Sequence, residues 1–135
     1  MEEIIGIDTS VFIYLFEGQG EYAKKAELVL SEVERGKKQG VFSSVGLIEL
    51  LVGTKREGRD DLVLQYKELI TRFPHLAIVG INENIVDIAS DVRAKYSIGT
   101  PDAIHIATAI DSGAKTFITN DAGLRKIKEI AVELL

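Results

Sequence analysis

Four acidic side chains of this sequence stand where carboxylates could act together. Asp8 and Asp121 each close a short apolar run that is typical of a buried strand. Asp102 opens a helical pattern, and Glu49 lies within the apolar stretch 45–52. Ligands of open α/β sheets bind at the carboxyl ends of the strands. Two like charges about 4 Å apart repel by roughly 4 kcal/mol at an effective dielectric of about 20, so such a cluster needs a bound cation.

The ligand types narrow the choice of that cation. The chain has no cysteine and only two histidines, His75 and His105, so thiolate or histidine-rich sites are excluded. Oxygen ligands favour Mg²⁺ or Mn²⁺. We therefore expect a metal-dependent enzyme whose metal is held mainly by carboxylates.

Three of the acids also have an ordinary structural explanation. Asp8 and Asp121 could each cap a following helix, because Asp is favoured at that position. Asp102 would complement the helix dipole in a first turn. Thr119 and Asn120 add hydrogen-bonding groups beside Asp121. For each acid alone the cap is about as good an explanation as the metal, or better, and only the set of four favours the metal.

Glu49 is harder to explain structurally. Val45 and Val52 lie one turn before and after it, which places it on an apolar face. Glutamate is rarely fully buried without a partner. A salt bridge to Lys55 or Arg56 is the structural alternative, although these cations lie six and seven residues downstream. The metal site is the favoured explanation.

Other polar residues near the acids have weaker claims. His105 follows Asp102 by one helical turn and could ligate a metal, but a packed, hydrogen-bonded role is favoured. Lys55, Arg56 and Arg59 could contact phosphates, but a solvated loop is favoured for them.

Strand and helix patterns alternate along the chain. Strands are expected at residues 3–8, 41–43, 76–79, 115–119 and 131–134. Helices are expected at residues 9–17, 21–38, 60–73, 82–96, 101–112 and 122–129, with another around Glu49. Ser44 and Thr100 are the expected caps of the helices that hold Glu49 and Asp102. This alternation predicts a single α/β domain over residues 1–135, with a mostly parallel sheet covered by helices on both faces.

Composition restricts the partners and the compartment. A net charge of −5 argues against a broad surface for duplex DNA. The longest nearly uncharged stretch, residues 41–54, is too short to cross a membrane, and Met1-Glu2-Glu3 lacks the basic start of a secretory signal. We expect a soluble, cytoplasmic protein.

The acids belong to an ordered set of short motifs. The set consists of Ile7-Asp8-Thr9-Ser10-Val11, Glu49, Thr100-Pro101-Asp102-Ala103-Ile104-His105-Ile106-Ala107 and Thr119-Asn120-Asp121. It resembles the PIN-domain (PilT N-terminus) family, and a compact domain of this length is similar to the VapC-type toxins of toxin–antitoxin pairs. Each motif alone is weak, but the ordered set spans essentially the whole chain and is specific.

The resemblance implies a metal-dependent endoribonuclease. Asp8, Glu49, Asp102 and Asp121 match the family's four acids. Ser10, which stands where the family often has Asn, and Thr119 match its supporting positions, beside Asn120. Members of the family commonly use Mg²⁺ or Mn²⁺, form homodimers and are inhibited by a small antitoxin.

Our hypothesis is hydrolysis of single-stranded RNA by metal-activated water. Asp8, Asp102 and Asp121 would bind one ion, and Glu49 would bind or orient a second ion or its water. A haloacid-dehalogenase-type site requires a second Asp at the position where this chain has Ser10. A receiver domain requires an adjacent acidic pair near the end of the first strand, which is not evident here. No glycine-rich turn follows the first strand, so dinucleotide binding is disfavoured. A non-catalytic RNA-binding module and an RNA-processing nuclease outside a toxin pair remain as alternatives.

Overall fold

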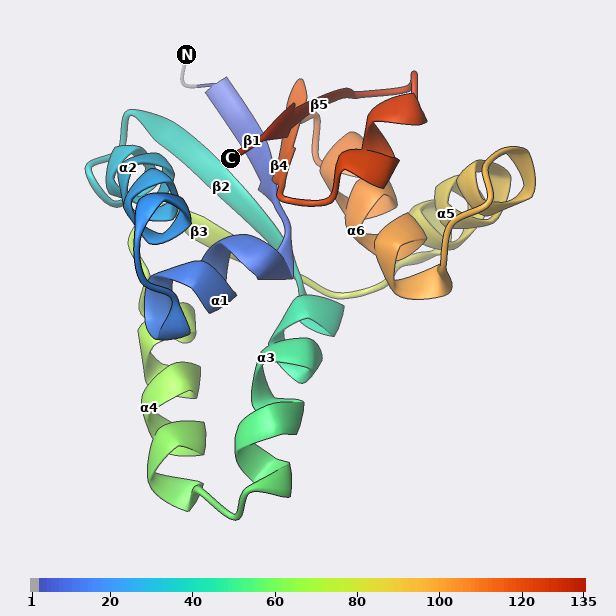
Figure 1. Cartoon of the computed structure of the whole chain (residues 1–135). Helices are drawn as coiled ribbons and strands as arrows, with labels where there is room; N and C mark the ends of the chain where they lie inside the picture. The colour runs from blue at the N-terminus through green and yellow to red at the C-terminus, as the bar shows by residue number, and fades with distance from the viewer. Residues whose placement is uncertain (1–2) are drawn as a thin grey trace.

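Five parallel strands form the central layer of the molecule (Figure 1). A computed structural model describes residues 3–135; Met1 and Glu2, which enter the expectation about a secretory signal, lie outside the described residues. The strands are β1 (Glu3–Ile7), β2 (Lys38–Ser43), β3 (Leu76–Val79), β4 (Thr116–Thr119) and β5 (Ala131–Leu134). They lie in the order β3-β2-β1-β4-β5, and every neighbouring pair is parallel. The predicted parallel α/β sheet is confirmed.

Helices cover both faces of this sheet. They are α1 (Thr9–Glu17), α2 (Glu21–Glu34), α3 (Ser44–Arg56), α4 (Asp60–Thr71), α5 (Glu83–Lys95), α6 (Thr100–Asp111) and the 3₁₀ helix η1 (Ala122–Lys126). Figure 1 shows α1 and α2 beside one part of the sheet, α5 and α6 beside another, and α3 and α4 projecting together. Among residues 3–135, no helix is long and apolar enough to cross a membrane.

Two apolar cores lie under these helices. One contains Ile5 and Ile7 of β1 together with side chains of α1 and α2, and includes Phe12, which is fully buried. The other joins Phe117 of β4 to α5, α6 and η1. Because β1 and β4 are packed by helices, their ends are held firmly at one edge of the sheet.

Gly6 allows α6 to pack closely on β1. A Cβ atom built at Gly6 would lie 2.4 Å from the Cβ of Ala109 in α6, a separation that real Cβ atoms essentially never show. The absence of a side chain at Gly6 therefore lets the helix that carries Asp102 and His105 approach the strand that ends at Asp8. In this way a single small residue helps to assemble the site.

The ends of β1 and β4 are adjacent in the sheet. Ile7 pairs with Ile118, and the amide of Asp8 donates to the carbonyl of Ile118 at 2.9 Å. Asp8 and Asp121 therefore both follow neighbouring strands at the carboxyl edge of the sheet.

Some element boundaries differ from the prediction. The helix expected at residues 21–38 ends at Glu34, because Gly36 takes a left-handed backbone (φ 79°) and β2 begins at Lys38. The helix expected at residues 122–129 is a five-residue 3₁₀ helix, η1, which ends at Lys126.

The caps predicted for α3 and α6 were each wrong by one residue. Ser43 caps α3, since its hydroxyl accepts from the amide of Val45 at 3.2 Å, whereas Ser44 is already helical. Gly99 is the cap residue of α6, and Thr100 already has helical geometry.

Candidate functional site

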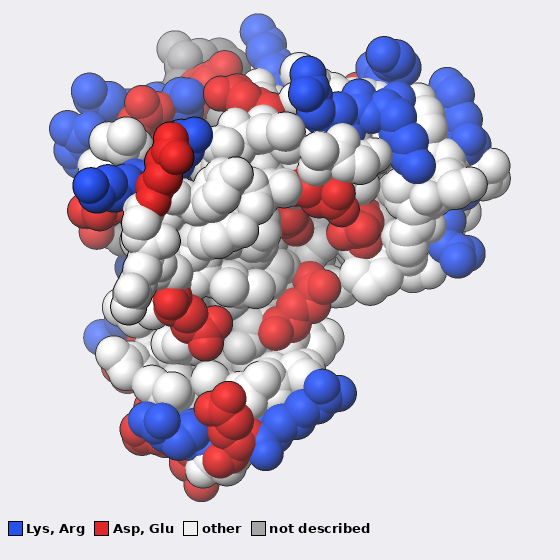
Figure 2. Space-filling view, viewed as in Figure 1, with Lys and Arg blue, Asp and Glu red and all other residues white. Residues whose placement is uncertain are grey.

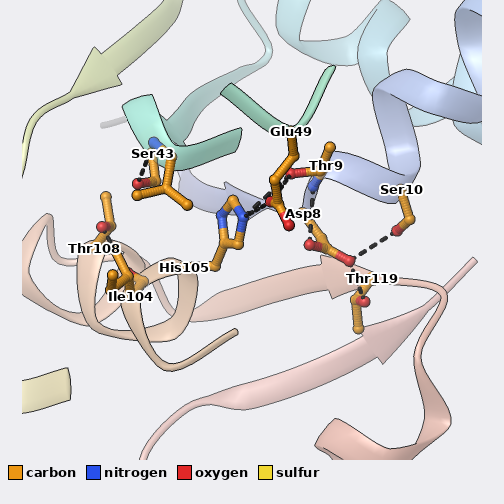
Figure 3. Close-up of polar contacts among 10 residues, drawn as sticks. Asp8, Thr9, Ser10, Ser43, Glu49, Ile104, His105, Thr108 and Thr119 are labelled. Carbon is orange, nitrogen blue, oxygen red and sulfur yellow. Dashed lines mark hydrogen bonds and ion pairs between the residues drawn. The ribbon is translucent and has the colours of Figure 1, made fainter. Parts of the chain in front are cut away.

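Asp8 is held in one orientation by three donors (Figure 3). Its Oδ1 accepts from the amide of Thr9 at 2.9 Å, which caps α1. Its Oδ2 accepts from the hydroxyls of Ser10 at 2.9 Å and Thr119 at 2.7 Å. A carboxylate has about four lone-pair positions, so these bonds fix the group and still leave room for a further partner.

The supporting hydroxyls link the two strand ends. Ser10 accepts from the backbone amide of Asn120 at 3.2 Å while it donates to Asp8. Thr119 accepts from the amide of Asp121 at 3.1 Å while it donates to the same carboxylate. The structure therefore places Ser10 and Thr119 between Asp8 and the turn that carries Asp121.

Asp121 and Asn120 occupy the turn after β4. The Oδ1 of Asp121 accepts from the amide of Gly123 at 2.9 Å and caps η1, and the residue is otherwise exposed. The side-chain amide of Asn120 donates to the hydroxyl of Tyr14 at 2.7 Å, which ties this turn to α1. The structural explanation of Asp121 as a cap thus holds, and its second carboxylate oxygen stays available.

The pKa of Asp102 is affected by the charges of the other three acids. It lies partly buried in the first turn of α6. Burial raises the pKa of its carboxyl above the ordinary value, and the negative charges of Asp8, Asp121 and Glu49 raise it further, while His105 acts in the opposite direction. Figure 2 shows acidic side chains gathered near the centre of this face of the molecule. The four acids therefore share one region of negative potential.

Glu49 is bound through a single oxygen. Its Oε1 accepts from the hydroxyl of Thr9 at 2.8 Å and lies 2.7 Å from Nε2 of His105 (Figure 3). The Nε2 atom also lies 3.1 Å from the Thr9 hydroxyl. The hydrogen bond from His105 lowers the pKa of the Glu49 carboxyl most, the Thr9 hydroxyl lowers it too, and partial burial opposes both. Glu49 is therefore held as a carboxylate.

The surroundings of Glu49 differ from the prediction. Its side chain is 40% exposed, so it does not lie on a buried apolar face; Leu50, Leu51 and Thr54 form the buried face of α3. Among residues 3–135 it pairs with His105 and makes no ion pair with Lys55 or Arg56. Of its apolar neighbours, Val45 is half-buried and Val52 is exposed.

His105 and Thr9 are the partners of Glu49 that the sequence pattern missed. His105 is only 3% exposed, and it is hydrogen-bonded within the helix layer rather than free as a metal ligand, as the sequence favoured. Neither partner lies near Glu49 in the sequence. The available signals were the position of Thr9 directly after Asp8, at the start of α1, and that of His105 one turn after Asp102.

Within the described residues, the basic side chains that follow Glu49 in the sequence do not pair with the acids of this site. Within the described part of the chain, no lysine or arginine forms an ion pair with Asp8, Asp102 or Asp121. Arg59 pairs with Asp61 at 3.1 Å and is exposed. Lys55 and Arg56 are exposed too, but they lie in the last turn of α3 and not in the expected loop.

The donor set fits a hard divalent cation. It consists of carboxylate and hydroxyl oxygens, which are the ligands that Mg²⁺ and Mn²⁺ prefer. In residues 3–135, no group of three acidic or histidine side chains stands in ligating geometry. Magnesium usually keeps several waters and takes only one or two protein carboxylates, so this arrangement remains compatible with it.

The family model for the PIN domain matches residues 5–130. No curated protein sequence matches the chain. The fold is similar to that of VapBC2 from Rickettsia felis bound to a promoter DNA fragment, with a TM-score of 0.75 and 19% identity over 97% of this chain and 98% of the other.

Two further solved structures are similar over nearly their whole length. A toxin–antitoxin complex from Klebsiella pneumoniae has a TM-score of 0.73 and 22% identity over 96% of both chains. VapC20 of Mycobacterium tuberculosis, described as a sarcin–ricin loop cleaving toxin, has a TM-score of 0.69 and 12% identity over 95% of this chain and 98% of that one. The TM-scores show a shared fold. Because the family model covers residues 5–130, the chain belongs to the PIN-domain family.

Proposed function

We propose that this protein is a divalent-metal-dependent endoribonuclease that hydrolyses phosphodiester bonds of single-stranded RNA. The observation that carries the proposal is the acidic cluster itself. Four carboxylates from four separate segments share one region, and no lysine or arginine pairs with Asp8, Asp102 or Asp121 among residues 3–135. Gathering these charges without a cation costs free energy, so the cluster is best explained by cation binding.

The residues of the cluster divide the work. Asp8, Asp102 and Asp121 would hold Mg²⁺ or Mn²⁺, one or two of them directly and the rest through its waters, and the ion when bound would activate water and stabilise charge on the phosphate. Asp8 is prepositioned for this by its three donors. Glu49 has an oxygen, Oε2, that accepts no hydrogen bond within the described residues and is free to orient a water or a second ion.

The toxin role is supported by the relatives in the structural comparison. Toxin–antitoxin complexes from Rickettsia felis and Klebsiella pneumoniae share the fold over nearly all of this chain. We therefore propose that the protein acts in the cytoplasm as the toxin of such a pair, forms a homodimer and is inhibited by a small antitoxin protein. A short gene for a DNA-binding protein beside its own would support this role, and co-purification of the two products would test it.

The activity is tested by incubating the purified protein with a panel of structured and unstructured RNAs. The panel includes a sarcin–ricin stem-loop, because one relative is described as cleaving that loop. We expect cleavage of at least one RNA with Mg²⁺ or Mn²⁺ and none with excess EDTA, with the cleaved positions mapped by primer extension. Undiminished cleavage in EDTA would exclude the metal mechanism.

A non-catalytic RNA-binding module is the alternative in a different class. That module would bind RNA without cutting any member of the panel, with or without added metal. Calorimetric titration with Mn²⁺ separates the two, because an intact nuclease site should bind the ion even when the preferred RNA is missing from the panel.

A further inference from the structure

Two donors converge on the same oxygen of Glu49. The Thr9 hydroxyl lies 2.8 Å from Oε1, and Nε2 of His105 lies 2.7 Å from it. Within the described residues, Oε2 accepts no hydrogen bond from the protein. The carboxylate is thus anchored on one side and open on the other.

The other ring nitrogen of His105 identifies the tautomer. Nδ1 is buried and has no hydrogen-bond partner in residues 3–135. A hydrogen on Nδ1 would be an unpaired buried donor, and the bare Nε2 would then face a carboxylate oxygen. With the hydrogen on Nε2, the ring donates to Glu49 and only a lone pair is left unpaired at Nδ1. The contacts therefore favour the Nε2–H form.

Aromatic packing holds this ring in place. His105 is stacked on Phe42 at 6.1 Å between ring centroids and lies 6.5 Å from Phe117. Gly46 leaves room for both Phe42 and the imidazole, since a Cβ there would lie 2.3 Å from the Phe42 ring and 2.9 Å from Cε1 of His105. A buried ring with fixed neighbours directs its N–H along one line.

We infer that His105 is a positioning residue, which together with Thr9 orients Glu49 so that Oε2 faces the proposed metal site. The inference rests on the proposed function, because it assigns a role toward the ion that the acids would hold. Removing a residue that hydrogen-bonds to a metal ligand typically lowers metal affinity by about 10–100-fold.

The test compares Mn²⁺ affinity, measured by calorimetry, across matched variants. His105→Met fills the apolar space without a donor and should weaken binding by roughly 10–100-fold. His105→Gln, whose amide nitrogen replaces Nε2, should restore most of the affinity. Thr108→Val is the control, because Thr108 is buried one turn further along α6 and donates only to the carbonyl of Ile104. We expect that variant to bind like wild type.

The Glu49→Gln background distinguishes positioning from a general structural role. If His105 acts through Glu49, His105→Met should cause little further loss of Mn²⁺ affinity in that background. An equal loss in both backgrounds would overturn the inference. If His105→Met does not fold, the Mn²⁺ affinities of Thr9→Val, which lacks the hydroxyl, and Thr9→Ser, which keeps it, are compared in the same two backgrounds.

A second readout does not depend on metal. The ¹⁵N spectrum of the His105 ring should show the hydrogen on Nε2, and its resonance should move in Glu49→Gln. A hydrogen on Nδ1, or a resonance unaffected by Glu49→Gln, would overturn the inference. Absence of Mn²⁺ binding by wild type, with the expected spectrum, would instead reject the proposed function and the role toward the ion while leaving the hydrogen bond established.

Discussion

Asp8 serves as a helix cap and as a member of the acidic cluster at once. The sequence left these as competing explanations. The structure confirms the cap, because the backbone amide of Thr9 donates a hydrogen bond of 2.9 Å to Asp8. Capping uses Oδ1, whereas the Ser10 and Thr119 hydroxyls approach Oδ2. The same bonds that stabilise α1 therefore orient the carboxylate at the edge of the sheet.

Substitutions at Asp8 should separate these two roles. Asp8→Asn keeps Oδ1 as the cap acceptor but puts an amide nitrogen where Oδ2 accepts from Ser10 and Thr119, so it should fold with some loss of stability. It should also lose Mn²⁺ binding and activity, because a charged ligand is gone. Asp8→Ala also removes the cap and should lower the free energy of unfolding by about 1 kcal/mol more. Urea unfolding and Mn²⁺ titration of both variants check this, and wild-type Mn²⁺ affinity in Asp8→Asn would contradict a ligand role.

Asp102→Asn should stabilise the metal-free protein near neutral pH. The folded pKa of Asp102 lies above its ordinary value of 3.8, chiefly because of burial and then because of Asp8 and Asp121. Its stabilising contribution is thus complete below that value and is lost as the pH rises through the raised pKa. The free energy of unfolding of Asp102→Asn, relative to that of wild type, should therefore increase from acidic to neutral pH. Urea unfolding at several pH values measures this difference. A difference in unfolding free energy that stays constant with pH would contradict the raised pKa of Asp102.

Glu49→Gln should show the opposite pH dependence. The folded pKa of Glu49 lies below its ordinary value of 4.5, first because of the His105 hydrogen bond. The stability that it contributes is present above that value and is lost as the pH falls through the lowered pKa. We expect wild type to exceed Glu49→Gln in stability near neutral pH and to lose that advantage in acid. Equal stabilities at all pH values would show that the His105 bond contributes nothing.

The candidate site was predictable from sequence only as far as local patterns reach. The positions of Asp8 and Asp121 at strand ends and of Asp102 at a helix start were predicted correctly, because the position of a residue within its element is a local property. The partners of Glu49 were not, because Thr9 and His105 lie 40 and 56 residues away and only the packed fold brings them together.

At the scale of elements, α3 depends on two glycines in opposite ways. A Cβ at Gly46 would collide with the fully buried Phe42 ring at 2.3 Å, whereas a Cβ at Gly53 would meet nothing within 4 Å. Gly46 is thus required for α3 to pack beside β2 and α6, and Gly53 only lowers helix propensity.

This difference gives a matched pair of substitutions in one helix. Gly46→Ala should destabilise the protein by about 1–3 kcal/mol through overpacking. Gly53→Ala should stabilise it by about 0.5–1 kcal/mol, because alanine favours the helix. Denaturant unfolding of both proteins measures the two effects. Similar changes in both would mean that α3 does not pack against Phe42 as described.

The order and type of the elements followed from the sequence better than their ends did. Buried runs such as that of β1 and helical periodicities such as that of α5 are strong local signals. The early end of α2 depends on Gly36 taking a left-handed turn, and the caps at Ser43 and Gly99 depend on backbone angles one residue from the predicted positions. The strand order is set by long-range pairing that no local pattern contains.

At the scale of the whole molecule, the acidic cluster adds to a net charge of −5. Burial and like charge disfavour the ionised form of Asp102 in the absence of a cation. The free energy that is lost in assembling the cluster should therefore reappear as stabilisation when a cation binds. Because the cluster joins β1, α3, α6 and the turn after β4, that stabilisation should be felt by the entire domain.

Thermal melts with and without divalent metal test this coupling. An ion that binds only the folded state stabilises it by about 2.7 kcal/mol at a concentration 100 times its dissociation constant. For a domain of this size that is a Tm increase of roughly 10 °C. Asp8→Asn should lose most of the increase, whereas Asp61→Asn, which removes only an exposed partner of Arg59, should keep it. An equal increase in all three proteins would mean that Mg²⁺ and Mn²⁺ act away from the cluster, through the general surface charge of the chain.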